Sequence, residues 1–128
     1  MVTEAGDSPF DPKNLDRKPE VSADEFFALD IRVGRVVSIQ DFPEARKPAW
    51  KLEVNFGPIV GILKTSAQIT NYSSEELEGR LVVGAINLGR KHIAGFTSEF
   101  LVLGSMDPDG TVRLLQVEEG VGLGAPIG

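Results

Sequence analysis

The sequence contains no cysteine and a single histidine, His92. The absence of cysteine excludes a disulfide scaffold, a thiolate metal site, a cysteine nucleophile and thiol redox chemistry, and it fits a reducing compartment. A zinc site with one imidazole and no thiolate would need an unusual shell of carboxylates. We therefore expect neither a metal nor another cofactor.

Long apolar runs are also absent. No stretch reaches the roughly 18 consecutive apolar residues of a membrane helix, and residues 1–7 lack the basic then apolar order of a signal peptide. We therefore expect a cytoplasmic protein that does not insert into membranes.

Catalytic motifs are missing as well. Ser98 and His92 are the only neighbouring hydroxyl and imidazole pair, and no Gly-x-Ser-x-Gly elbow surrounds Ser98. The 14 glycines do not follow the order of a phosphate-cradling loop. The sequence therefore predicts a protein that binds without catalysing a reaction.

Positive charge is scarce overall, because the net charge is -6, but it is unevenly distributed. Residues 1–30 carry 3 basic and 8 acidic side chains, residues 31–100 carry 9 and 7, and residues 101–128 carry 1 and 4. Seven basic residues lie on or beside the central strands: Arg32, Arg35, Arg46, Lys47, Lys64, Arg90 and Lys91. If the fold gathers them on one side, they form a patch that can follow a phosphate backbone.

The composition is otherwise that of an average globular protein. A chain of 128 residues with 41% hydrophobic and 25% charged residues fits one domain with a single core. Residues 1–21 are rich in Asp, Pro, Lys and Glu, so we expect an acidic, flexible arm there and one domain at 22–128.

The pattern of the domain predicts an all-β fold. Ser22 and Glu25 have capping-box spacing and predict a short helix, and Ser73 and Glu76 predict another that ends at Gly79. Strands are predicted at 31–40, 50–56, 59–64, 81–86 and 99–103, with a bulge at Gly34, a loop at 87–97 and a further strand at 111–117. This order matches a five-stranded OB-fold Greek-key barrel with a short helix between strands three and four and short N- and C-terminal extensions. A β-sandwich is the alternative.

Aromatic residues discriminate between classes of nucleic acid. Trp50 and Phe56 share the apolar face of the second predicted strand and so belong to the core, which leaves no clear platform for stacking unpaired bases. That favours a folded RNA recognised through shape, phosphate and 2′-hydroxyl contacts. The loop aromatics Phe42, Tyr72 and Phe96 are the candidates that would contradict this interpretation.

Four segments in order carry a family resemblance: Asp30–Val36, Asp41–Pro48, Thr65–Thr70 and Ile93–Glu99. Over about residues 26–117 the chain resembles the CsaA family, which lies within the wider tRNA-binding-domain group of OB-fold proteins. The resemblance implies a homodimeric, export-related chaperone that binds unfolded peptide segments on a fold shared with tRNA binders. It places the family's Ser-Ala-Gln segment, its asparagine, its basic loop and its Ser-Glu pair on Ser66 to Gln68, Asn87, Arg90 and Lys91, and Ser98 and Glu99.

Two binding hypotheses follow, with tRNA or another folded RNA and unfolded polypeptides as the partners. For RNA, the expected site residues are Arg32, Arg46, Lys47, Lys64, Ser66, Gln68, Asn87, Arg90, Lys91, Ser98 and Glu99. We expect Glu99 to orient a basic neighbour or to accept from backbone amides, because its charge repels phosphate. For peptides, a groove across a dimer would expose Phe42, Ile93 and Phe96. Phe26, Phe27 and Val121 to Ile127 are the apolar termini expected to bury area between two subunits.

Overall fold

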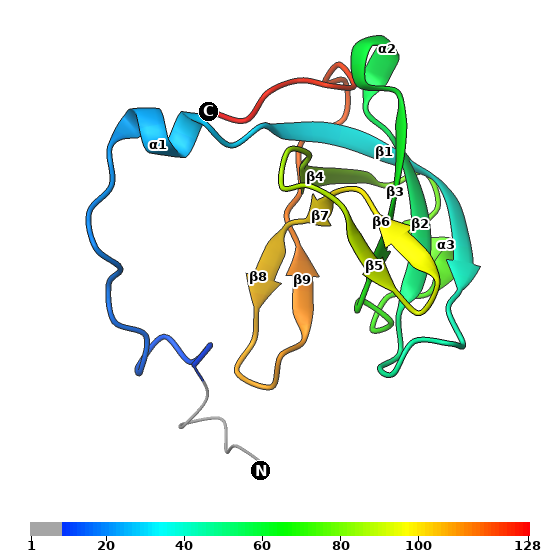
Figure 1. The fold of residues 1–128 in the computed structure, drawn as a ribbon, viewed down its shortest axis with the longest axis horizontal. Coiled ribbons are helices and arrows are strands. Elements are labelled where there is room, and N and C mark those ends of the chain that lie inside the picture. The colour runs from blue at the N-terminus through cyan, green and yellow to red at the C-terminus, as the bar shows by residue number, and fades with distance from the viewer. Residues whose placement is uncertain (1–8) are drawn as a thin grey trace.

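The computed structural model describes residues 9–128. Residues 1–8 of the predicted arm therefore lie outside the described residues, and residues 9–22 run beside the barrel without a helix or strand (Figure 1). Helix α1 (Ala23–Phe27) follows, and its capping box is the predicted one: Ser22 Oγ accepts from the Glu25 N–H, and the Glu25 carboxylate accepts from the Ser22 N–H, both at 3.1 Å. No helix in the described part of the chain is long and apolar enough to span a membrane.

Five antiparallel strands form one sheet in the order β3-β2-β1-β4-β7. They are β1 (Ile31–Asp41), β2 (Trp50–Asn55), β3 (Ile62–Ala67), β4 (Leu81–Ala85) and β7 (Leu101–Val102). The sheet curls until its two end strands, β3 and β7, nearly meet. Two hydrogen bonds connect β3 to the segment before β7: the Glu99 N–H donates to the Lys64 carbonyl at 2.8 Å, and Thr65 Oγ1 donates to the Phe100 carbonyl at 2.7 Å. The predicted all-β OB-type barrel is therefore confirmed against the sandwich alternative.

The core explains why this sequence curls into a barrel. Leu52, Val54 and Phe56 of the alternating second strand are at most 1% exposed, and the Phe56 ring packs edge-on against Phe100 with centroids 5.0 Å apart. Gly34 makes this packing possible, because a Cβ there would lie 2.5 Å from Val54 Cγ1 and 2.9 Å from the Phe56 ring. The bulge predicted at Gly34 is wrong, since the register shift lies between Val36 and Ser38.

The third strand begins later than predicted. Gly57–Val60 forms the short helix α2, with Pro58 in its first turn where a missing N–H costs nothing. Ile59, predicted to begin the strand, is 91% exposed. The helix predicted between strands three and four is confirmed as α3 (Ser74–Leu77), with reciprocal bonds between Ser73 and Glu76.

Two hairpins complete the fold. The predicted loop at 87–97 contains β5 (Lys91–Ile93) and β6 (Phe96–Ser98), joined by Ala94 and Gly95, both at positive φ. The pair β8 (Gly104–Met106) and β9 (Val112–Leu114) surrounds the predicted turn at 107–110. The strand predicted at 99–103 is thus divided between a closing segment, β7 and the approach to β8.

The C-terminal segment adds a further edge to β1. The Val33 N–H donates to the Ala125 carbonyl at 3.0 Å, the Gly124 N–H donates to the Val33 carbonyl at 2.8 Å, and the Ile127 N–H donates to the Ile31 carbonyl at 2.9 Å. Figure 1 shows this segment crossing the top of the barrel toward α1. The backbone of this segment therefore completes the sheet of its own chain, and the expectation that Val121 to Ile127 bury area between two subunits stays a prediction.

Candidate functional site

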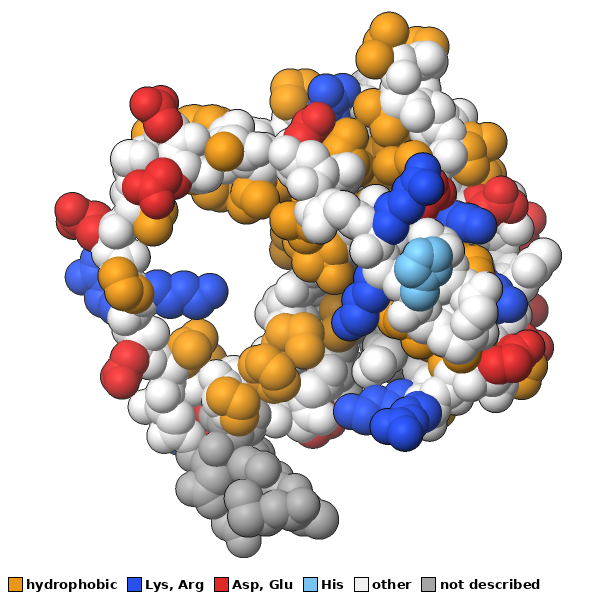
Figure 2. Space-filling view, in the orientation of Figure 1, with side chains coloured by type: hydrophobic (Ala, Val, Ile, Leu, Met, Phe, Trp, Pro, Cys, Tyr) orange, Lys and Arg blue, Asp and Glu red, His pale blue; other side chains and the backbone are white. Residues whose placement is uncertain are grey.

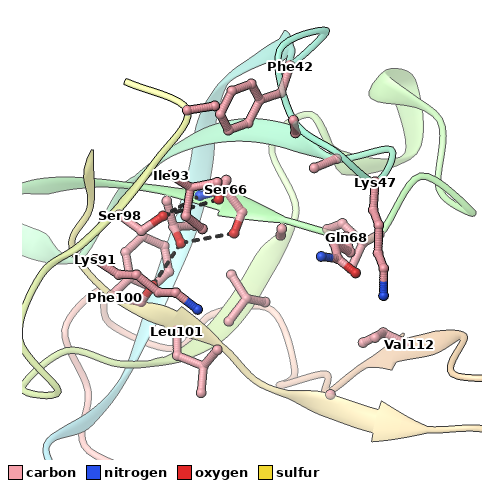
Figure 3. A pocket seen from close by; sticks show the side chains of 18 of the residues that line it. Phe42, Lys47, Ser66, Gln68, Lys91, Ile93, Ser98, Phe100, Leu101 and Val112 are labelled. Atoms are coloured by element: carbon pink, nitrogen blue, oxygen red, sulfur yellow. Dashed lines mark hydrogen bonds between the residues drawn. The ribbon is translucent and has the colours of Figure 1, made fainter. Parts of the chain in front are cut away.

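One side of the barrel holds an open pocket of about 1130 Å³, called the groove below. Its lining comes from residues within 42–49, 65–69, 88–94, 98–106 and 110–112. These are the β1–β2 loop, the end of β3, the approach to β5 and the β5–β6 hairpin, and the strands that lead into the β8–β9 hairpin (Figure 3). The groove therefore lies where OB folds bind their ligands, beside the second and third strands.

Positively charged side chains dominate the rim of the groove. Arg46 and Lys47 come from the β1–β2 loop, Arg90 and Lys91 from the start of β5, and Glu44 is the only carboxylate among the lining residues. In the part of the chain that the structure describes, Arg90 alone of these four cations has an ion pair. Figure 2 shows Lys and Arg side chains around the histidine on this face. The groove is thus a region of positive potential on an acidic molecule.

The floor of the groove is where the barrel closes. The Ser66 N–H donates to Ser98 Oγ at 3.0 Å, and the two hydroxyl oxygens are 3.2 Å apart (Figure 3). Gln68 lies nearby with an exposed amide that has no hydrogen-bond partner within residues 9–128. The two serines therefore join strands to each other, whereas Gln68 is available to a ligand.

Glu99 has the structural role predicted for it. Its carboxylate accepts from the Lys64 N–H at 3.1 Å, and its other oxygen lies 3.7 Å from Arg90. The first contact fastens the closing segment to β3, and the second is a loose surface pair that leaves Arg90 largely exposed. Glu99 is therefore a positioning residue at the edge of the groove.

Besides Glu99, three of the predicted RNA-binding residues lie away from the groove lining. The Arg32 guanidinium is held by Asp30 at 2.6 Å and by the Gly124 carbonyl at 3.3 Å. Asn87 accepts from the Asp30 N–H at 2.8 Å and donates to the Ala28 carbonyl at 2.9 Å, so it fixes the junction between α1 and β1. Lys64 lies on the outer face of β3. A role in RNA binding stays a prediction for these three.

Arg35 shows that the seven basic residues are not all gathered on one side. It pairs with Glu119 at 3.0 Å and donates to the Gly79 carbonyl at 2.7 Å. The hydrogen bond between the two side chains raises the pKa of Arg35 and lowers the pKa of Glu119. Arg35 therefore attaches the C-terminal region to the barrel. Of the seven basic residues expected on one face, four lie on the groove rim.

The aromatic residues expected to receive peptides are arranged differently from the prediction. Phe42 is only 4% exposed, with its ring centroid 5.5 Å from that of Phe96, so it belongs to the packing and the expectation of an exposed Phe42 is wrong. Ile93 lines the groove, whereas Phe96 lines a separate small cavity. The exposed large apolar residues of the groove are Leu88, at 54%, Leu101, at 53%, and Met106, at 40%. Sequence reasoning missed all three. Leu101 lies in a predicted strand, where an apolar residue is expected in the core, and Leu88 and Met106 lie in predicted connections that carry no local signal of a groove.

Comparison with known proteins places this groove in a family. Residues 31–126 match the family model tRNA_bind, described as "Putative tRNA binding domain". The chain belongs to this family. The match spans the whole barrel from β1 to the C-terminal segment, and so includes every element that lines the groove.

Relatives of this tRNA-binding domain occur both as parts of enzymes and as separate proteins. Methionine–tRNA ligase of Nanoarchaeum equitans is 35% identical over 122 residues, which are 89% of this chain and 15% of the ligase. The CsaA chaperone protein of Picrophilus torridus has a TM-score of 0.80 and 43% identity, over 85% of this chain and all of that protein. The chaperone CsaA of Bacillus anthracis has the same TM-score at 40% identity, over 86% and 100%. The chain thus spans about a seventh of the ligase but the full length of the chaperones.

Proposed function

We propose that this protein is a non-catalytic binding protein that takes folded RNA, of the tRNA class, into the groove. The observation that carries the proposal is the charge of the rim, which holds Arg46, Lys47, Arg90 and Lys91. Glu44 is the only carboxylate of the lining, and Glu99 lies at its edge, 3.7 Å from Arg90. Such an arrangement suits phosphate oxygens, which tolerate variation in position and reward each added cation. Membership of the tRNA-binding family supports the same conclusion.

The aromatic residues that pack in the barrel support a folded RNA over an unpaired strand. Trp50 is half-buried and donates its indole N–H to the Tyr72 carbonyl at 3.1 Å, and Phe42, Phe56 and Phe100 are buried. None of these rings is free to stack on a splayed base, which is the usual contact of single-strand binders. Recognition through the backbone and the shape of a helix remains as the mode.

Salt dependence tests the proposal. Binding of purified tRNA, followed by fluorescence anisotropy, should weaken on the order of a hundredfold between 50 and 200 mM salt if about four phosphates are neutralised. The variant with Arg90→Ala and Lys91→Ala should bind roughly tenfold more weakly, with a salt slope smaller by about one to two. The pair Lys13→Ala and Lys18→Ala removes the same charge from the N-terminal segment and should change little. A flat salt response, or equal losses in both pairs, would overturn the proposal.

A second candidate function is the binding of unfolded peptide segments, favoured by the apolar side chains of the groove. Leu101 and Met106 are exposed there, and the structurally similar proteins are named chaperones. Suppression of the aggregation of an unfolded client should then persist at raised salt and fall with Leu101→Ala. Leu115→Ala, which truncates a leucine that is 44% exposed outside the groove lining, is the control.

We also propose that the protein forms a homodimer. Phe26 and Phe27 are 43% and 61% exposed on α1, and apolar side chains line both sides of the hollow between the N-terminal segment and the barrel (Figure 2). A second copy of the chain would cover them. Sedimentation equilibrium should give twice the monomer mass for the wild-type protein. The variant with Phe26→Ser and Phe27→Ser should give the monomer mass. A monomeric wild-type protein at micromolar concentration would contradict the dimer.

A further inference from the structure

A second, smaller cavity of about 250 Å³ lies on the outer face of β2 and β3, outside the groove. Its polar lining consists of Ser38 and Gln40 from β1, Lys51 and Glu53 from β2, and Lys64 from β3. Leu52 of β2 and Phe96 of the β5–β6 hairpin are its apolar members. All of these side chains belong to elements fixed by the sheet or by the hairpin packed on it. The cavity is therefore a preformed feature of the barrel surface.

Two ammonium groups in this cavity share one aromatic ring. Lys51 Nζ lies 5.4 Å from the centroid of Phe96 and 4.8 Å from that of Phe42, and Lys64 Nζ lies 5.5 Å from the centroid of Phe96. Lys51 is opposite Ser66 in the register of β2 and β3, so Lys64 is its diagonal neighbour on the same face. The sheet thus places both positive charges within 5.5 Å of the centroid of the same ring.

Neither lysine is neutralised by a carboxylate in the described chain. Glu53 faces Lys64 directly across the two strands, yet no oxygen of Glu53 comes within 4.0 Å of either ammonium group. The rings attract the two cations but do not cancel their charge. An anion that contacts both ammonium groups would relieve their mutual repulsion, and the hydroxyl of Ser38 and the amide of Gln40 supply neutral donors beside it.

The hairpin separates this cavity from the groove. Ile93 of β5 lines the groove, whereas its cross-strand partner Phe96 of β6 lines the second cavity. Lys91 at the start of the hairpin belongs to the groove rim. Positive charge is therefore present on both sides of the hairpin, with the hairpin as a ridge between the two sites.

From this arrangement the geometry points to a second phosphate site: Lys51 and Lys64, beside Phe96, bind a phosphodiester of the same RNA whose backbone occupies the groove, so that the RNA lies across the β5–β6 hairpin. The inference rests on the proposed RNA-binding function and adds to it a contact outside the groove. A phosphodiester suits the site because it needs two cationic donors and little depth. Glu53 opposes the bound charge, so its neutralisation should strengthen binding.

The test compares three double variants by tRNA anisotropy over a range of salt; two of them remove the same charge and the third retains it. Lys51→Gln with Lys64→Gln should lower affinity roughly tenfold and reduce the salt slope by about one to two, and Lys13→Gln with Lys18→Gln should change neither. Lys51→Arg with Lys64→Arg should restore affinity, and equal thermal midpoints establish that each variant folds. Glu53→Gln should raise affinity.

In an NMR titration, inorganic phosphate should shift the amides of residues 38–40, 51–53, 64 and 96.

The outcomes separate this inference from the proposed function. Suppose that the Lys51 and Lys64 variant binds tRNA as tightly as the Lys13 and Lys18 variant, while loss of Arg90 and Lys91 still weakens binding. The second phosphate site is then wrong, and RNA binding in the groove is retained. If phosphate shifts no amide near Phe96, the second site is also overturned. If tRNA binding is independent of salt in the wild-type protein, the RNA-binding function itself fails and the inference fails with it.

Discussion

Ser98 Oγ accepts a hydrogen bond from the backbone N–H of Ser66 at 3.0 Å, and this contact joins β6 to β3 at the floor of the groove. Ser98 is 8% exposed, so the bond is screened from water. The neighbouring bonds from Thr65 to Phe100 and from Glu99 to Lys64 continue the same seam. The residues that the family resemblance assigns to RNA therefore also close the barrel on which the groove depends.

Replacement of Ser98 by alanine should destabilise the fold by about 1–3 kcal/mol, because the Ser66 N–H loses its acceptor in a partly buried position. Chemical denaturation measures this loss, and Ser105→Ala, at an exposed position, should stay within about 0.5 kcal/mol of the wild type. We expect tRNA affinity to change little below the unfolding transition. Unchanged stability with lost tRNA binding would instead make Ser98 an RNA contact.

Replacement of Glu99 by glutamine should raise tRNA affinity about threefold to fivefold. The carboxylate lies 3.7 Å from Arg90, and two unit charges at about that distance in water interact by roughly 1 kcal/mol. Glutamine removes the charge but retains an oxygen that accepts from the Lys64 N–H. Glu118→Gln removes the same charge outside the groove lining and is the control. A lower affinity for Glu99→Gln would show that the carboxylate orients Arg90 for the RNA.

The pair of Arg35 and Glu119 predicts a component of stability that is lost in acid. The hydrogen bond from Arg35 lowers the pKa of Glu119, so the contribution is present above the unfolded-state pKa and disappears as pH falls through the folded-state pKa. The raised pKa of Arg35 puts its own loss far into the alkaline range. The denaturation midpoint of Glu119→Gln should therefore lie below that of the wild type at pH 7 and coincide with it at about pH 2. Equal midpoints at both pH values would contradict the pairing.

Features with local causes could be predicted from the sequence. The bonds between Ser22 and Glu25 and between Ser73 and Glu76 span three residues, so their spacing alone predicts the two caps. The alternation that follows Trp50 likewise predicts which face of β2 is buried. The strand order could then be predicted by combining these elements with the OB-fold Greek-key architecture.

Features with distant causes could not be predicted. Arg35 is bound by a carboxylate 84 positions along the chain, so no local pattern distinguishes it from the cations of the groove rim. The β5–β6 hairpin was missed because Ala94 takes the φ of +47° that turn sequences normally assign to asparagine or glycine. Lys51 was not among the predicted site residues, because its contact with the Phe96 ring joins residues that are distant in the sequence.

Replacement of Gly34 by alanine tests the packing that shapes the barrel. The added Cβ would lie 2.5 Å from Val54 Cγ1 and 2.9 Å from the Phe56 ring, both in the tightly packed core, so β1 and β2 must separate. We expect a destabilisation of at least about 1–3 kcal/mol. Gly122→Ala is the matched control, because its Cβ would meet no atom within 4 Å and its φ is not positive. If both variants unfold at the same denaturant concentration, Gly34 is not required by the core, and the curvature of β1 must have another cause.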